Sequence, residues 1–157
     1  MAYAENTSVS VEKTEAEIKG LLRKHGAAGF MTGEEPGRAM IAFQMAERRV
    51  IFRLPLPDQK DRRFTLDGRN NARPADKRMA AWEQACRSRW RALFLCIKAK
   101  LESVESGIES FEDAFLGQIM MPDGSTVSEN VRPRIAQAYA SNTMQPLLPA
   151  PAKSGGA

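Results

Sequence analysis

Apolar residues in the second half of the chain recur at spacings of three and four, which predicts one long amphipathic helix. The pattern runs from Asp76 to Ser106, and Gly107 follows as a helix stop. About 30 helical residues span roughly 45 Å, more than a three-stranded sheet can cover. The far end of the helix therefore needs the C-terminal helices or another subunit. The stripe consists of Met79, Trp82, Cys86, Trp90, Leu93, Ile97, Leu101, Val104 and Ile108.

Between Gly26 and Pro57 the pattern changes to alternation, which predicts short antiparallel strands. In the third strand the core-facing positions alternate with Arg49 and Arg53, so these two arginines are expected to share the opposite face. Pro55 and Pro57 end the sheet, because proline lacks the amide hydrogen that a strand ladder needs. The expected strands cover residues 28–32, 38–45 and 49–54.

The remaining segments supply an N-terminal helix and two shorter C-terminal helices. Ser10 is expected to cap the first helix, Ser110 the short third helix and Ser128 the last one. The last helix is expected to turn Val131, Ile135, Ala138 and Tyr139 inward. The predicted class is α+β: an N-terminal helix, a three-stranded antiparallel meander, the long amphipathic helix packed on it, and two shorter helices.

The predicted domain organisation is simple. Residues 1–10 are expected to form a flexible lead, residues 11–144 a single domain, and residues 145–157 a disordered tail. Inside the domain, residues 58–75 have no apolar period and are expected to form a long exposed loop. Structureless loops of this length are usually either functional or disordered, and the sequence leaves both alternatives open.

Composition narrows the protein class. At 157 residues, 43% apolar and 27% charged, the chain fits one soluble domain. No apolar run approaches the ~20 residues of a membrane span, and no secretory signal precedes the domain, so we expect a cytoplasmic protein without membrane contact. One histidine and two distant cysteines offer almost nothing for a zinc or serine-hydrolase centre. We therefore expect no enzyme and no cofactor.

Charge is distributed unevenly along the chain. Residues 1–47 carry five Lys/Arg and seven Asp/Glu, residues 48–100 carry fifteen and five, and residues 101–157 carry three and seven. The middle third is thus +10 within a chain whose net charge is +4. An arginine-rich excess of this kind is typical of surfaces that meet phosphates or an acidic protein. The alternative is that these cations only solvate one loop and one helix.

The candidate interface combines the third strand, the 58–75 loop and one flank of the long helix. Phe64 is the single aromatic of the loop and could either stack on a base or anchor the loop to the core. A second basic flank of the helix consists of Arg78, Arg89 and Lys100. The candidate nucleic-acid-binding residues are Arg49, Arg53, Lys60, Arg62, Arg63, Phe64, Arg69, Arg73, Arg87, Arg91 and Lys98.

Two resemblances bear on function. The order of elements, a helix followed by three strands and a second helix, is similar to that of double-stranded-RNA-binding domains. The three-stranded meander followed by a long helix also resembles the core of single-strand annealing proteins. Over most of the chain the amino-acid sequence resembles a group of small proteins encoded by bacteriophages and prophages. This resemblance implies a phage context but no particular activity. The segments that carry this resemblance are VIFRLPLP (50–57), WEQACRSRWRAL (82–93), IKAKLESV (97–104) and MPDGSTV (121–127).

These observations predict a non-enzymatic, phage-encoded module that binds DNA or RNA through phosphates, without sequence preference. The alternative is a protein-interaction module that inhibits or redirects a host protein. It would use the same basic surface against an acidic host partner, or the long helix as the seam of a homo-oligomer.

Overall fold

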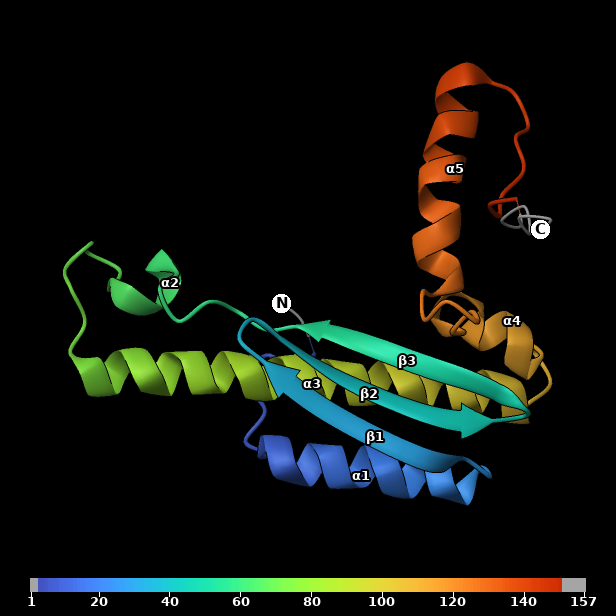
Figure 1. Ribbon diagram of the computed structural model, residues 1–157. Coiled ribbons are helices and arrows are strands. Elements are labelled where there is room, and N and C mark those ends of the chain that lie inside the picture. The colour runs from blue at the N-terminus through green and yellow to red at the C-terminus, as the bar shows by residue number, and fades with distance from the viewer. Residues whose placement is uncertain (1–2, 151–157) are drawn as a thin grey trace, which may run out of the picture.

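A computed structural model describes residues 3–150 as a three-stranded antiparallel sheet with helices packed on one face (Figure 1). The predicted α+β class and order of elements are confirmed. In chain order the elements are α1 (Val11–Lys24), β1 (Ala28–Glu35), β2 (Arg38–Met45), β3 (Arg48–Pro55), α2 (Arg62–Thr65), α3 (Ala75–Glu105), α4 (Phe111–Phe115), the 3₁₀ helix η1 (Leu116–Gln118) and α5 (Val127–Ser141).

The sheet is a meander in the order β1-β2-β3, joined by two tight turns. Ala46 and Glu47 both have positive φ, at 50° and 61°, which is the geometry of a type I′ hairpin turn. The other turn places Gly37 at φ 85° directly after Pro36. β1 reaches three residues beyond its predicted end at Thr32, because Glu35 still pairs with Arg38 across the hairpin.

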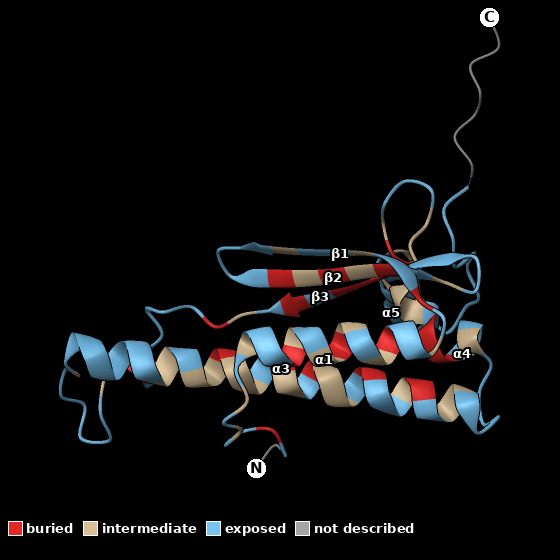
Figure 2. Cartoon of the chain, turned by 90° about the horizontal axis from the view of Figure 1, so that it is seen from below, coloured by how far each residue is buried: buried red, intermediate tan, exposed pale blue. Residues whose placement is uncertain are grey.

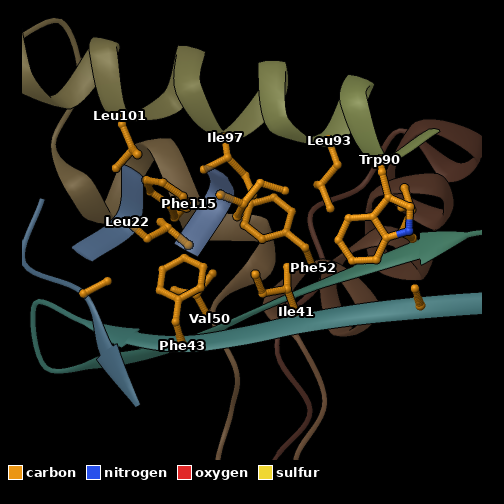
Figure 3. Close-up of a cluster of buried hydrophobic side chains, with 14 of the residues drawn as sticks. Leu22, Ile41, Phe43, Val50, Phe52, Trp90, Leu93, Ile97, Leu101 and Phe115 are labelled. Atoms are coloured by element: carbon orange, nitrogen blue, oxygen red, sulfur yellow. The ribbon is translucent and has the colours of Figure 1, made fainter. Parts of the chain in front are cut away.

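The core lies between the sheet and the helices (Figure 3). Ile41 is opposite Phe52 and Phe43 opposite Val50 in the β2–β3 register, so one face of the sheet is apolar. The Phe43 and Phe52 rings are stacked with their centroids 6.4 Å apart, and the Phe115 ring meets both edge-on. Edge-to-face contacts of this kind add to the energy of apolar burial.

The α1 and α3 helices lie side by side beneath the sheet (Figure 2). Ser10 caps α1, as predicted, by accepting a hydrogen bond from the amide of Lys13. The central part of the predicted α3 stripe is buried, namely Cys86, Trp90, Leu93, Ile97 and Leu101. Ile108 instead lies beyond the helix end and is 79% exposed, because Gly107 ends the helix at φ 76°.

The central part of the apolar stripe of α3 is occupied within the chain, because it faces the sheet and α1. A homo-oligomer seam along α3 stays a prediction, and Met79 near the N-terminal end of the stripe is 44% exposed. The two ends of α3 are met by other segments of the chain. α4 packs beside its C-terminal end, and α2 lies beside its N-terminal end (Figure 1).

The predicted flexible lead is wrong for its described part, residues 3–10. Ala4 is only 4% exposed, and the side-chain amide of Gln84 donates to the carbonyls of Glu5 and Thr7 at 3.1 and 2.8 Å. Residues 3–10 are therefore packed on α3. Polar residues without a period can still dock when a partner helix satisfies their carbonyl groups. Residues 1 and 2 lie outside the described part of the chain.

The C-terminal region departs from the prediction in two ways. α5 is capped by Thr126 and not by Ser128, and the side chains of Thr126 and Glu129 form a capping box. None of the residues predicted to face inward is buried: Ile135 is 43% and Tyr139 87% exposed. Figure 1 shows the reason: α5 stands away from the sheet, and its main contacts are with η1 at its base.

The predicted tail is only partly described. Residues 145–150 turn back toward α5, and the Arg134 guanidinium donates to the carbonyl of Pro146 at 3.0 Å. Residues 151–157 lie outside the described part. Within residues 3–150, no helix is both long and apolar enough to span a bilayer.

Candidate nucleic-acid interface

Several of the predicted binding arginines are already paired within the fold. Arg53 on β3 contacts the carboxylate of Glu129 on α5, and Arg91 on α3 contacts Glu17 on α1. The hydrogen bond from Arg91 is the main reason that the pKa of Glu17 lies below its usual value. These two arginines join elements of the fold, and a phosphate would have to compete with a carboxylate for each of them.

The other predicted α3 cations are also engaged. The Arg87 guanidinium donates to Oε1 of Gln84 at 3.0 and 2.5 Å. The Lys98 ammonium lies 6.0 Å from the centre of the Phe94 ring, and the Arg91 guanidinium lies 4.2 Å from the same ring centre. On the second flank of the helix, Lys100 donates to the carbonyl of Ala114 at 2.7 Å. Arg87, Arg91 and Lys100 therefore have partners within the fold, whereas Arg78, Arg89 and Lys98 are exposed without an ion pair within residues 3–150.

Exposed cations without an ion pair within residues 3–150 gather in the connection between the sheet and α3. Lys60, Arg62 and Arg69 are exposed there, and Arg73 is partly exposed. We call residues 58–78 the basic arm; it holds seven Lys/Arg and four Asp. Arg49 is likewise exposed without an ion pair, but it lies at the opposite end of β3 from the arm.

Residues 58–75 are mostly exposed, as predicted for a loop, but they contain local structure. The segment contains the short helix α2, and Leu66 and Ala72 form a β-bridge that closes its tip. The amide of Arg73 donates to the carbonyl of Thr65 at 2.9 Å, which holds the returning strand against α2. These local hydrogen bonds hold the segment together although its sequence has no apolar period.

Three aspartates build the turns of the arm. Asp58 accepts from the amide of Lys60 at 2.9 Å, Asp61 from Arg63 at 3.0 Å, and Asp67 from Arg69 at 2.8 Å. Amide donors from Asn71 and Arg69 hold the pKa of Asp67 below its usual value. Each carboxylate thus accepts a hydrogen bond from a backbone amide within its own turn. The residue that provides this amide, two positions later, is a lysine or an arginine.

Phe64 anchors the arm, which is the second of the two roles that the sequence left open, and its buried ring does not favour stacking on a base. The side chain is 4% exposed, and the Arg63 guanidinium lies 4.6 Å from its ring centre. Arg63 also pairs with Asp61 at 3.6 Å, so it belongs to the anchor more than to the free surface. An aromatic ring in an otherwise polar connection is buried whenever a neighbouring helix offers apolar surface.

Two cations outside the predicted set complete the surface. Lys77 and Arg78 belong to the first turns of α3 and are exposed. Lys60 and Arg78 line a hollow of about 300 Å³ between the arm and α3, together with Gln59, Thr65 and Trp82. Their continuity with the basic loop was a signal in the sequence, since only Pro74, Ala75 and Asp76 separate them from Arg73.

No family model matches this chain, and neither a curated protein nor a solved structure matches it significantly.

Proposed function

We propose that the protein is a non-enzymatic module that binds DNA or RNA through phosphate contacts from the basic arm, without sequence preference. The observation that carries this proposal is the ordered presentation of Lys60, Arg62 and Arg69, which are exposed and have no ion pair within residues 3–150. Guanidinium and ammonium groups in this state can take phosphate oxygens as partners without breaking a contact of the fold.

The arm also explains why contacts to phosphates are favoured over contacts to bases. Its aromatic residue, Phe64, is buried, so the arm offers cations but no exposed ring within its own residues. Stacking on bases contributes much of the affinity of single-strand binders. The arm is therefore expected to bind duplexes at least as tightly as single strands.

The resemblance to small phage and prophage proteins extends this proposal to cellular context. In that context the protein is encoded by a phage and acts on nucleic acid in the cytoplasm of the host cell. A nucleic-acid module of this kind needs no cofactor, because binding to phosphates is electrostatic.

The test compares two triple variants with equal charge. The arm variant is Lys60→Ala, Arg62→Ala and Arg69→Ala; the control variant is Lys13→Ala, Lys24→Ala and Arg132→Ala, whose side chains are exposed elsewhere. Fluorescence anisotropy with labelled single- and double-stranded DNA and RNA is measured at about 50 and 200 mM salt. Both variants are first checked by circular dichroism for unchanged folding.

We expect the wild type to bind at low salt and to lose affinity steeply as salt rises. Each lost phosphate contact lowers the slope of log K against log salt by about 0.9 on duplex DNA, so the arm variant should lose up to about 2.7. The control variant should keep the wild-type slope. Equal losses in both variants would overturn the assignment to the arm, and no binding at 50 mM would favour an acidic host protein as the partner.

A further inference from the structure

A groove runs along α3 where the strands end, and at one end it adjoins the hollow of the arm, with which it shares Gln59, Lys60 and Trp82. It consists of two adjoining hollows of about 810 and 370 Å³ that share Glu34, Leu56 and Trp82. One hollow reaches the β1–β2 turn, and the other reaches the first turn of α1. The groove exists because α3 extends beyond the ends of the strands (Figure 2).

The floor of this groove is apolar and fixed in place. The Trp82 indole Nε1–H donates to the carbonyl of Pro57 at 2.7 Å, which sets the orientation of the ring. Pro57 is buried and Leu56 half-buried beside it. Trp82 itself is only half-buried although its polar atom is satisfied, so the exposed part of the ring is free to contact a ligand.

The rim of the groove is acidic in a protein whose net charge is positive. Glu34 projects from β1 and Glu83 from α3, and both are exposed without an ion pair within residues 3–150. Burial raises the pKa of the Cys86 thiol, and the charges of Glu34 and Glu83 add to the increase. Both carboxylates therefore act on the same point between the sheet and the helix.

The other charged residues along the groove leave its net charge negative. Asp58 and Glu12 line its two ends, and each is exposed. The cations are Lys60 and Arg87, and Arg87 already donates to Gln84. An acidic rim around an aromatic floor repels phosphate, so this surface is not an extension of the nucleic-acid interface.

We propose that this groove binds an extended basic segment of a partner protein, with an arginine or lysine side chain over the Trp82 ring and its charge between Glu34 and Glu83. Cations bind to the face of tryptophan through its quadrupole, and a nearby carboxylate adds a charge-assisted hydrogen bond. The proposal goes beyond nucleic-acid binding, because it concerns a groove lined mainly by residues outside the arm and a ligand of opposite charge. It stands whether or not the arm binds phosphates.

The experiment uses two peptides that differ in charge alone. One is an acetylated, amidated peptide of alternating glycine and arginine with three arginines; the other has citrulline at each arginine position. Titration into the full-length ¹⁵N-labelled protein is followed by the indole N–H resonances of Trp82 and Trp90, which a Trp82→Phe variant assigns. Trp90 is buried but also lines the groove, so the backbone amide resonances of α5, which does not line it, serve as the internal reference.

We expect the arginine peptide to shift the Trp82 indole resonance and to leave the amide resonances of α5 in place. The citrulline peptide should shift neither. Glu34→Gln with Glu83→Gln should weaken binding about tenfold, as expected for losing two exposed charge contacts. Glu102→Gln, which removes an exposed carboxylate farther along α3, should leave binding unchanged. Retained folding of each variant is confirmed by its remaining amide spectrum.

Several results would overturn the proposal. They are an unmoved Trp82 resonance at saturating peptide, equal shifts with citrulline, or equal weakening by Glu102→Gln. Sedimentation of the protein alone tests the remaining occupant, a second copy of the chain. Dimers that dissociate in the Glu34→Gln, Glu83→Gln variant would assign the groove to the basic arm of another copy, and so would also overturn binding of a foreign partner.

Discussion

The basic arm and α5 differ in how closely they pack against the rest of the molecule. In both, the packing is the opposite of what the sequence pattern suggests. The basic arm, residues 58–78, lacks an apolar period before α3 begins, yet it is folded onto that helix and buries Phe64. α5 has apolar residues at helical spacing, yet it stands clear of the sheet and buries none of its residues. Apolar periodicity therefore indicates a helix but does not show whether the helix is packed.

The difference lies in how each part is held. The buried Phe64 ring and the packing of α2 hold the arm on α3, and the aspartate turns shape the arm itself. α5 depends on its first turn, where the Thr126 capping box and the contact from Arg53 to Glu129 join it to the body. Isolated helices of about this length are marginal in water, so the remaining turns of α5 have little support.

Removing one aromatic ring from each part gives the largest expected contrast. Phe64→Ala should lower the free energy of unfolding by about 3 kcal/mol, because the ring is buried and its removal leaves a cavity. Tyr139→Ala should change it by less than about 0.5 kcal/mol, because that ring is 87% exposed. Urea denaturation followed by circular dichroism measures both.

Hydrogen exchange separates local from global effects in the same pair of variants. If Phe64→Ala leaves the urea midpoint unchanged but exposes the amides of residues 62–66, the arm unfolds independently of the sheet. If those amides also stay protected, Phe64 does not anchor the arm and the comparison between the two parts is wrong.

A second test alters α5 alone. Pro133 lies inside the helix, where it lacks an amide hydrogen and crowds the preceding turn. Pro133→Ala should raise the helicity of residues 127–141 and their protection from hydrogen exchange, with up to about 3 kcal/mol of local stabilisation. The urea midpoint of the body should not move. A parallel increase in global stability would show that α5 is coupled to the sheet after all.

The smallest expected effect comes from a titration within the body. His25 Nδ1 donates to the carbonyl of Leu21 at 2.9 Å, and Nε2 lies 3.2 Å from the carboxylate of Glu105. The bond to Leu21 is the main cause that raises the pKa of His25; burial opposes it and Glu105 adds to it. The folded protein therefore holds this proton more tightly than the unfolded chain does.

The sign of the pH dependence follows from this raised pKa. The stabilisation is complete below about pH 6.5, the ordinary value for histidine, and is lost as pH rises through the higher pKa of the folded state. Urea denaturation at about pH 6 and pH 8 should differ by less than about 1 kcal/mol, since Glu105 is mostly exposed. Glu105→Gln should reduce the difference, and the helicity of α5 should not respond. An unfolding free energy that increases with pH over this range would contradict the prediction.

Much of the fold could be predicted from the sequence because its signals are local. The spacing of Trp90, Leu93 and Ile97 predicted α3, and alternation in the strands predicted the apolar face that includes Phe43. The candidate site was harder. The sequence showed a basic middle third but not which cations were free, because ion pairs such as Arg91 with Glu17 join residues far apart in the chain.

The sequence by itself determined the α+β class, the order of the elements and the basic character of residues 58–78, since periodicity, turn residues and charge are local properties. Only the tertiary structure decided that Phe64 is an anchor, that Arg53 and Arg91 are joined to carboxylates, and that α5 is unpacked. It also decided that Trp82 and Glu34 face one groove. The physical reason is that burial and charge pairing depend on which distant segments meet, and no pattern of neighbouring residues specifies that.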